Sequence, residues 1–325
     1  MFSRQEINHY EFENVPLNQD IFLMQEKWLP AYEQYIEDVY LGRNPDPVGY
    51  ISYAAVNSIS DNLLEISWYP NVLDRFHEVA LRLPRSEFVC CVGCRDIDEK
   101  PRIFVSNDWI EDLHRRPYSA FALVDAIGVK KALDAGSLKE SKLLSLRNAL
   151  DSIAASNPDI AMFSFADSVL VKLDWTVGAF DNKISYTYVP EKLIDILEVT
   201  FDAFEEHIGL GCYACITQGF NEYSDGKVIH RSAQGNHISL NNLGLPFAQL
   251  LSIDQAAHQA IQSEKHGPYQ FYLDSNYYRS LQWRHGFDRD TQPAGPYDSP
   301  MSRCSGKYYC LNLNVVRENI ATSST

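Results

Sequence analysis

Hydrophobic positions along the chain recur at two spacings, which distinguish helices from strands. Apolar side chains three and four residues apart at 25–40 and 192–207 predict two amphipathic helices. Two short apolar runs, 160–165 and 169–173, are separated by turn residues and predict a hairpin of strands. Further helices are predicted at 109–115, 127–135, 137–155 and 246–264, and further strands at 119–124, 212–217, 269–273 and 308–314.

The region before Pro117 contains further, mostly short predicted elements. Besides the helices at 25–40 and 109–115, they are a loosely held terminus at 1–20, a helix at 72–83, and strands near Tyr50, at 87–92 and at 102–105. Beyond Pro117, residues 220–242 form a polar segment that we expect to be irregular. The pattern predicts an α+β chain in three parts: a small N-terminal α+β unit of unknown role at 1–117, a main domain at 118–286, and a loop-rich extension at 287–325.

Composition and charge limit the classes of partner. The chain has 325 residues, 45% of them hydrophobic, which is enough for one large core or two ordinary ones. Its net charge of -15 disfavours nucleic acids and anionic membrane surfaces, because both repel an acidic protein that lacks a basic patch. We find no apolar run long enough to span a bilayer and no leader-like start. We therefore expect a cytoplasmic protein without nucleic-acid or membrane partners.

Seven cysteines are scattered along the chain, and two pairs of them have a spacing that zinc sites use. The pairs Cys91/Cys94 and Cys212/Cys215 both fall in apolar segments that read as strands. On a strand, residues three apart point to opposite faces, so neither pair could chelate a metal without a turn. Buried, reduced thiols are the favoured interpretation over a zinc site.

Two aspartates interrupt the apolar runs of the main domain. Asp125 follows the apolar run 119–124, and Asp167 lies between two predicted strands. A carboxylate in such a place is costly to desolvate unless a cation, hydrogen bonds or water meet it. Each could simply cap a helix or occupy a turn. Together on neighbouring strands, they would form an all-oxygen site suited to Mg²⁺ or Mn²⁺.

The residues around these aspartates resemble the catalytic domain of class III nucleotide cyclases, and the chain is similar to a divergent bacterial member. The resemblance rests on four segments: 124–129, 165–169, 214–219 and 244–254. It implies a ferredoxin-like βαββαβ core that converts a nucleoside triphosphate into a cyclic nucleotide and pyrophosphate, in a homodimer. It also implies that Asp125 and Asp167 bind two metal ions. The backbone of Ala126, Ile127, Gly128 and Val129 would then line the triphosphate.

The chain departs from this family at the residues that complete its active site. The base-reading lysine of the family corresponds to Phe163, an apolar residue that could stack a different base. The asparagine and arginine of the family correspond to Ala248 and Ser252, or in another register to Ser239 and Leu243. Neither register recovers the pair.

These departures leave three interpretations open. The chain could be an active cyclase, with His230 or Arg231 in place of the missing arginine. It could be a catalytically degenerate module that binds a nucleotide or a protein partner for regulation. It could also share only the ferredoxin-like core, because fold does not determine function.

Overall fold

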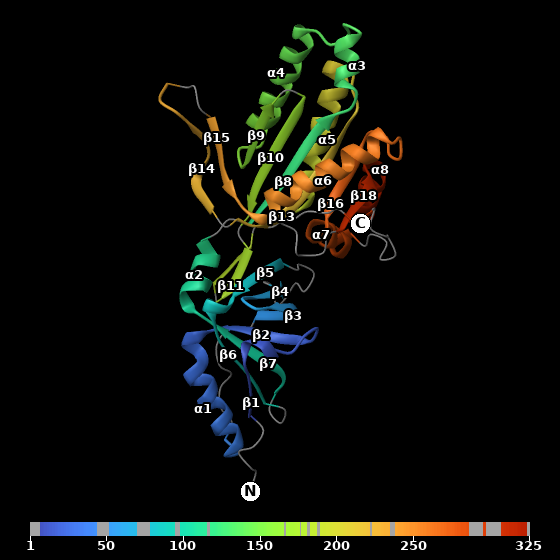
Figure 1. The fold of residues 1–325 in the computed structure, drawn as a ribbon. Coiled ribbons are helices and arrows are strands. Elements are labelled where there is room, and N and C mark those ends of the chain that lie inside the picture. Colours follow the sequence, from blue (N-terminus) through green and yellow to red (C-terminus); the bar gives the residue numbers. More distant parts are fainter. Residues whose placement is uncertain are drawn as a thin grey trace. The chain divides into compact units, whose positions relative to one another are not determined.

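The structure is a computed structural model that describes residues 7–43, 52–69, 79–94, 98–115, 118–165, 167–175, 177–180, 183–186, 189–221, 223–234, 238–285, 295–296 and 307–323. Contacts divide the chain into two compact units (Figure 1). The first comprises residues 1–115 with 176–186, and the second comprises 116–175 with 187–325. The predicted three-part division at 117 and 286 is not tested by these contacts and stays a prediction.

The first unit contains a seven-stranded mixed sheet in the order β1-β6-β7-β2-β3-β4-β5. Its strands are β1 (Ile7–Tyr10), β2 (Asp20–Gln25), β3 (Ser52–Ser60), β4 (Leu63–Tyr69), β5 (Val79–Pro84), β6 (Phe88–Cys94) and β7 (Asp98–Val105). Helix α1 (Leu29–Tyr40) packs Tyr32 and Ile36 against Met24, Val92 and Phe104 of the sheet. Helix α2 (Asn107–Arg115) and the hairpin β11 (Val177–Phe180) and β12 (Lys183–Tyr186) complete the unit.

Two predictions for this unit are wrong. The terminus is not loose from Ile7 onward, because β1 pairs along its whole length with β6. The predicted helix at 72–83 is a strand from Val79, while 70–78 lie outside the described residues. Leu81 and Leu83 are buried on either side of the partly exposed Arg82, and this period of two is that of a strand paired with β4.

The second unit contains another seven-stranded sheet, in the order β17-β18-β16-β13-β8-β10-β9. Its strands are β8 (Tyr118–Ala126), β9 (Ile160–Phe165), β10 (Ser168–Trp175), β13 (Cys212–Phe220), β16 (Gln270–Asp274), β17 (Gly295–Pro296) and β18 (Lys307–Asn312). Its helices are α3 (Val129–Asp134), α4 (Glu140–Ser156), α5 (Glu191–Ile208), α6 (Leu245–Gln262), α7 (Ser275–His285) and α8 (Leu313–Ser323). The predicted α+β class and the βαββαβ core are confirmed, since β8, β9, β10 and β13 form the ferredoxin-like order β13-β8-β10-β9.

Helices α5 and α6 cover opposite faces of this sheet. Phe201 of α5 stacks on Phe271, with ring centroids 5.3 Å apart. The next residue of β16, Tyr272, points to the other face and packs in a cluster with Leu250 and Ile253 of α6. Strand β8 lies between the two layers, and its residues from Tyr118 to Val124 are buried. The strand that ends at Asp125 is therefore held rigidly on both sides.

The segment predicted to be polar and irregular at 220–242 is instead a hairpin of β14 (Tyr223–Arg231) and β15 (Ile238–Leu243). The two strands pair with each other in a separate two-stranded sheet, with a register shift between Ser224 and Ile229. A ribbon outside the large sheet does not require one apolar face, so the alternation that signals a strand is weak there.

Cys90, Cys91, Cys212, Cys215 and Cys310 are free thiols, and Cys91, Cys212 and Cys215 are buried. Burial raises the pKa of Cys91 to about 12, so this thiol stays protonated and is a poor metal ligand. Burial likewise raises the pKa of Cys212 and the pKa of Cys215. The interpretation as buried structural thiols is therefore favoured over zinc binding.

None of the helices in the described part of the chain has the length and hydrophobicity required to cross a bilayer.

Gly219, near the end of β13, is in close contact with the start of α6. A Cβ atom at this position would lie 2.7 Å from Cγ of Pro246, closer than packed atoms allow. The ring of Pro246 thus fills the space that a side chain at this position would need. We expect Gly219→Ala to lower the free energy of unfolding by about 1–2 kcal/mol in urea titrations. Gly267→Ala is the matched control, because nothing lies within 4 Å of its Cβ position; equal effects of the two would contradict this contact.

Asp274 is a buried carboxylate at the junction of β16 and α7. Its oxygens accept the N–H groups of Tyr277 (2.7 Å) and Gln218 (3.1 Å). Burial nevertheless raises the pKa of this carboxyl to about 7, the N–H groups opposing the shift.

The raised pKa of Asp274 makes a pH-dependent contribution to stability. Between about pH 4 and 7 the folded state holds this proton and the unfolded state does not, so the free energy of unfolding falls as pH rises. The contribution has a slope of at most about 1.4 kcal/mol per pH unit. Urea titrations across this range should show a smaller decline in Asp274→Asn than in the wild type. An unchanged slope would show that Asp274 is ionised throughout.

Candidate functional site

Strand pairing brings Asp125 and Asp167 to the same end of the sheet in the second unit. Strand β10 runs antiparallel to β8 and places Ser168 opposite Asp125. The N–H of Ala126 donates to the carbonyl of Asp167 at 3.3 Å. Both aspartates are partly exposed, whereas β8 before Asp125 is buried. The structure therefore places these two predicted residues side by side at a solvent-accessible end of the core.

The carboxylate of Asp125 is oriented by two hydroxyl groups. Ser168 Oγ donates to Asp125 Oδ1 at 2.6 Å, and the hydroxyl of Tyr213 lies 3.2 Å from Asp125 Oδ2. The Tyr213 hydroxyl also lies 2.8 Å from Oδ1 of Asp254, on α6. A tyrosine has one hydroxyl hydrogen, so it can donate fully to only one of the two carboxylates at a time. Tyr213 thus links two carboxylates that it cannot both satisfy.

Burial and mutual repulsion disfavour the charged forms of these carboxylates. The pKa of Asp125 is raised, first by burial and then by the charge of Asp167, while Ser168 and Tyr213 act in the opposite direction. The pKa of Asp254 is also raised, again first by burial, with a further contribution from Asp125. A cation among the carboxylates would reverse both effects, because it favours their ionised forms.

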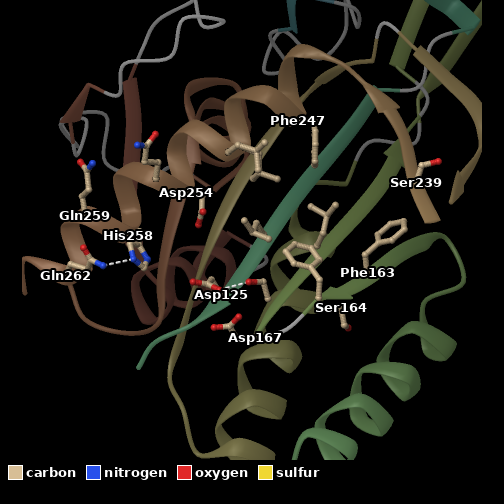
Figure 2. A pocket seen from close by; sticks show the side chains of 17 residues that line it. Asp125, Phe163, Ser164, Asp167, Ser239, Phe247, Asp254, His258, Gln259 and Gln262 are labelled. Atoms are coloured by element: carbon tan, nitrogen blue, oxygen red, sulfur yellow. Dashed lines mark hydrogen bonds between the residues drawn. The ribbon is translucent and has the colours of Figure 1, made fainter. Parts of the chain in front are cut away.

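A pocket of about 1050 Å³ opens over these residues. Figure 2 shows Asp125, Asp167, Asp254 and His258 grouped toward the left of the view, with Phe163 and Ser239 toward the right and Phe247 above. The pocket therefore has an acidic end and an end with aromatic side chains. Among the lining residues that the structure describes, none is a lysine or an arginine.

Of the residues predicted to hold the base or the triphosphate, only Phe163 is among the described residues that line this pocket. Phe163 lies on β9 and lines the pocket. The segment 126–129 is not among the described lining residues, and the N–H of Ile127 is engaged by the carbonyl of Gly211 at 2.8 Å. Gly128 has a φ of 83° and precedes α3. The backbone contact with phosphates expected of Ala126, Ile127, Gly128 and Val129 stays a prediction.

The positions that correspond to the asparagine and arginine of the cyclases contribute little to the pocket. Neither Ala248 nor Ser252 is among its described lining residues, and Ser252 donates to the carbonyl of Ala248 within α6. Ser239, from the rival register, does line the pocket. The side chains of His230 and Arg231 lie outside the described residues.

Tyr213, Asp254 and His258 were missed by the sequence analysis. Asp254 carries the same signal as Asp125, since it follows the mostly apolar run 250–253. Tyr213 reads as an ordinary core residue of an apolar strand. Its function becomes apparent only from the register that places it opposite Asp125.

The donor atoms of the acidic end suit a hard divalent cation. No group of three or more His, Cys, Asp or Glu side chains within the described ranges could hold a metal ion by itself. Asp125 and Asp167 provide carboxylate oxygens alone, the ligands that Mg²⁺ and Mn²⁺ prefer. Mg²⁺ usually binds one or two carboxylates and takes its remaining ligands from water and substrate phosphates. The acidic end fits this pattern.

Comparison with known proteins finds similar chains among solved structures only at low sequence identity. No protein-family profile and no curated protein sequence matches the chain. Among solved structures, the adenylyl cyclase CyaB from P. aeruginosa is similar at 11% identity over 61% of this chain and 95% of that one, with a TM-score of 0.38. The guanylate cyclase domain of RhGC from Catenaria anguillulae, in complex with GTP, is similar at 8% identity over 60% of this chain and 97% of that one, with a TM-score of 0.39. A bacterial light-regulated adenylyl cyclase matches at 8% identity over 64% of this chain and 98% of that one, with a TM-score of 0.37.

Proposed function

We propose that the second unit is a metal-dependent nucleotide cyclase, which converts a nucleoside triphosphate into a cyclic nucleotide and pyrophosphate. The observation that carries this proposal is the placement of Asp125 and Asp167 side by side in one pocket, on paired strands. Two adjacent carboxylates whose charges repel are suited to hold divalent ions over a triphosphate. The aromatic end of the pocket can accept a nucleobase.

The residues of the chain have separate tasks in this reaction. Asp125 and Asp167 would hold Mg²⁺ or Mn²⁺, which when bound can favour deprotonation of the ribose 3′-hydroxyl and neutralise phosphate charge. Ser168 and Tyr213 keep the Asp125 carboxylate in one orientation. Phe163 would position the base so that the 3′-oxygen approaches the α-phosphorus in line. The new bond joins the 3′-oxygen to the α-phosphorus. The bond between the α-phosphorus and the oxygen that bridges it to the β-phosphorus breaks, and pyrophosphate leaves. The proton of the 3′-hydroxyl passes to solvent.

We further propose that the enzyme works as a homodimer. A triphosphate carries several negative charges, yet the described lining residues include no lysine or arginine. Metal ions and a second copy of the chain can supply the missing positive charge. Sedimentation of the full chain with a triphosphate and Mn²⁺ should therefore show a dimer at micromolar concentration. A monomer that turns over substrate under these conditions would contradict a shared site.

The direct test is incubation of the purified chain with each of the four ribonucleoside triphosphates and Mn²⁺. We expect one of them to give a cyclic monophosphate and pyrophosphate in equal amounts, identified by chromatography and mass spectrometry. If no triphosphate reacts and neither the triphosphates nor Mn²⁺ raise the melting temperature, the proposal is wrong.

A catalytically degenerate regulatory module is the second candidate. The uncharged Ala248 and Ser252, with the absence of lysine and arginine from the described lining, favour this function. Such a module would bind a metal and triphosphate, which raises the melting temperature, and form no cyclic product. The same incubation separates the two functions.

A further inference from the structure

We propose that His258 is the phosphate-binding residue of this pocket and contacts the triphosphate directly. The inference rests on the proposed function, because it assigns a partner for the phosphates at the same site. It concerns a side chain on α6, the helix that covers the acidic end.

The geometry of α6 directs His258 toward the carboxylates. Leu250, Ile253 and Ala257 form the buried face of the helix against the sheet. Asp254, His258 and Gln262 follow one another at intervals of four residues along the edge of that face and line the pocket. Figure 2 shows His258 beside Asp254 on the acidic side of the pocket. His258 is exposed, so a ligand can reach its ring.

Charge singles out His258 among the side chains of the pocket. It is the one described lining residue that can carry a positive charge, and it shares the pocket with three carboxylates, those of Asp125, Asp167 and Asp254. A positive charge on its ring acts on both carboxylates that contact the Tyr213 hydroxyl, because it lowers the pKa of Asp125 and the pKa of Asp254. Among the described lining residues, an anion held over the carboxylates by metal ions would therefore find its cationic partner in the His258 ring.

A neighbouring amide holds the His258 ring in place. The Gln262 Nε2 position lies 2.7 Å from Nε2 of His258, one helical turn away. The amide can donate to a neutral ring or, with its oxygen turned to the ring, accept from a charged one, so the contact persists in either state. No hydrogen bond is described for the other ring nitrogen, Nδ1. One nitrogen is thus used for orientation, and the other is available to donate to a phosphate oxygen.

The ordinary alternative is that His258 only lies on the helix surface beside Asp254 and Gln262. Such pairs stabilise a helix only slightly and do not bind ligands. A ligand-binding measurement distinguishes the two roles, because a surface pair would leave phosphate affinity unchanged.

The experiment uses inorganic tripolyphosphate as a probe that lacks base and ribose. Isothermal titration of the full chain with tripolyphosphate in Mn²⁺ should show binding that weakens about tenfold in His258→Ala, the loss typical of one charge-assisted hydrogen bond. His258→Arg should stay within about threefold of the wild type, since it restores a cation and a donor. His207→Gln is the matched control: His207 bonds Ser145 on the other face and is not among the described lining residues.

Each outcome decides the role of His258. Unchanged tripolyphosphate affinity in His258→Ala, or no tripolyphosphate binding by the wild type, would overturn the proposal that His258 binds phosphate. Loss of Mn²⁺ binding in His258→Ala without tripolyphosphate would also overturn it, and would make His258 a metal ligand. If His258-dependent tripolyphosphate binding is found but no triphosphate is cyclised, His258 binds phosphate as proposed and the cyclase function fails.

Discussion

Asp125→Asn is expected to reduce the rate of cyclic nucleotide formation by at least about 10³-fold, because losing a metal-binding carboxylate removes several kcal/mol of charge stabilisation. Asparagine has nearly the same shape and keeps an oxygen that can accept the bond from Ser168. Its amide group can in turn donate to the hydroxyl of Tyr213. The fold should therefore survive while the negative charge is lost. The rate is measured from the initial formation of cyclic product at saturating Mn²⁺.

The control for this substitution separates charge from structure. Ser168→Ala removes the hydrogen bond that orients Asp125 and leaves the carboxylate in place, so its loss of rate should be much smaller than that of Asp125→Asn. Asp167→Asn should behave like Asp125→Asn, since both carboxylates are assigned to the same ions. A rate within tenfold of the wild type in either asparagine variant would contradict the metal assignment.

Tyr213→Phe is expected to lower the free energy of unfolding by about 1–2 kcal/mol, because it removes a donor from two carboxylates that water reaches only in part. The tyrosine hydroxyl is 2.8 Å from Asp254 and 3.2 Å from Asp125, and both carboxylates are half-buried. Without the Tyr213 hydroxyl, the carboxylates of Asp125 and Asp254 lose the hydrogen-bond donor that they share, and no other side chain replaces it, while their charges still repel each other. Urea titration at pH 7 measures the difference.

Tyr269→Phe is the matched control for Tyr213→Phe. Its hydroxyl also donates to a carboxylate, that of Glu205, but at an exposed position where water can replace the donor. We expect its effect to stay below about 1 kcal/mol. Asp254→Asn should act in the opposite direction to Tyr213→Phe, because the amide oxygen still accepts from Tyr213 while the repulsion with Asp125 disappears. If Tyr213→Phe and Tyr269→Phe lower the free energy of unfolding equally, the Tyr213 hydroxyl between Asp125 and Asp254 makes no special contribution to stability.

The sequence predicts the core of the second unit well because its central strands β8 and β13 are buried on both faces. A doubly buried strand such as β8 has a continuous apolar run, and a carboxylate at its end is conspicuous. The hairpin of β9 and β10 follows from two such runs with a short turn between them. Asp125 and Asp167 can therefore be selected as a pair from the order of residues alone.

Other parts of the site depend on contacts that no local pattern reports. Tyr213 acts through its register with Asp125, and a tyrosine in an apolar strand looks like a packing residue. Asp254 acts through the position of α6 over the sheet, which places its carboxylate at the hydroxyl of Tyr213. The ribbon of β14 and β15 was missed because its strands do not build a face of the large sheet. In each case tertiary placement, rather than residue type, determines the role.

The most direct measurement for the second unit is the number of Mn²⁺ ions bound per chain, counted by electron paramagnetic resonance with and without tripolyphosphate. Two carboxylates leave most of each coordination sphere to water and phosphate, so binding should be weak with the ion alone and tight when tripolyphosphate is present. We expect about two tightly bound ions per site with tripolyphosphate, as in two-metal sites, and their loss when Asp125 and Asp167 are both asparagine. Wild-type protein that binds no Mn²⁺ with tripolyphosphate, or a double variant that binds as many ions as the wild type, would contradict a metal centre at Asp125 and Asp167.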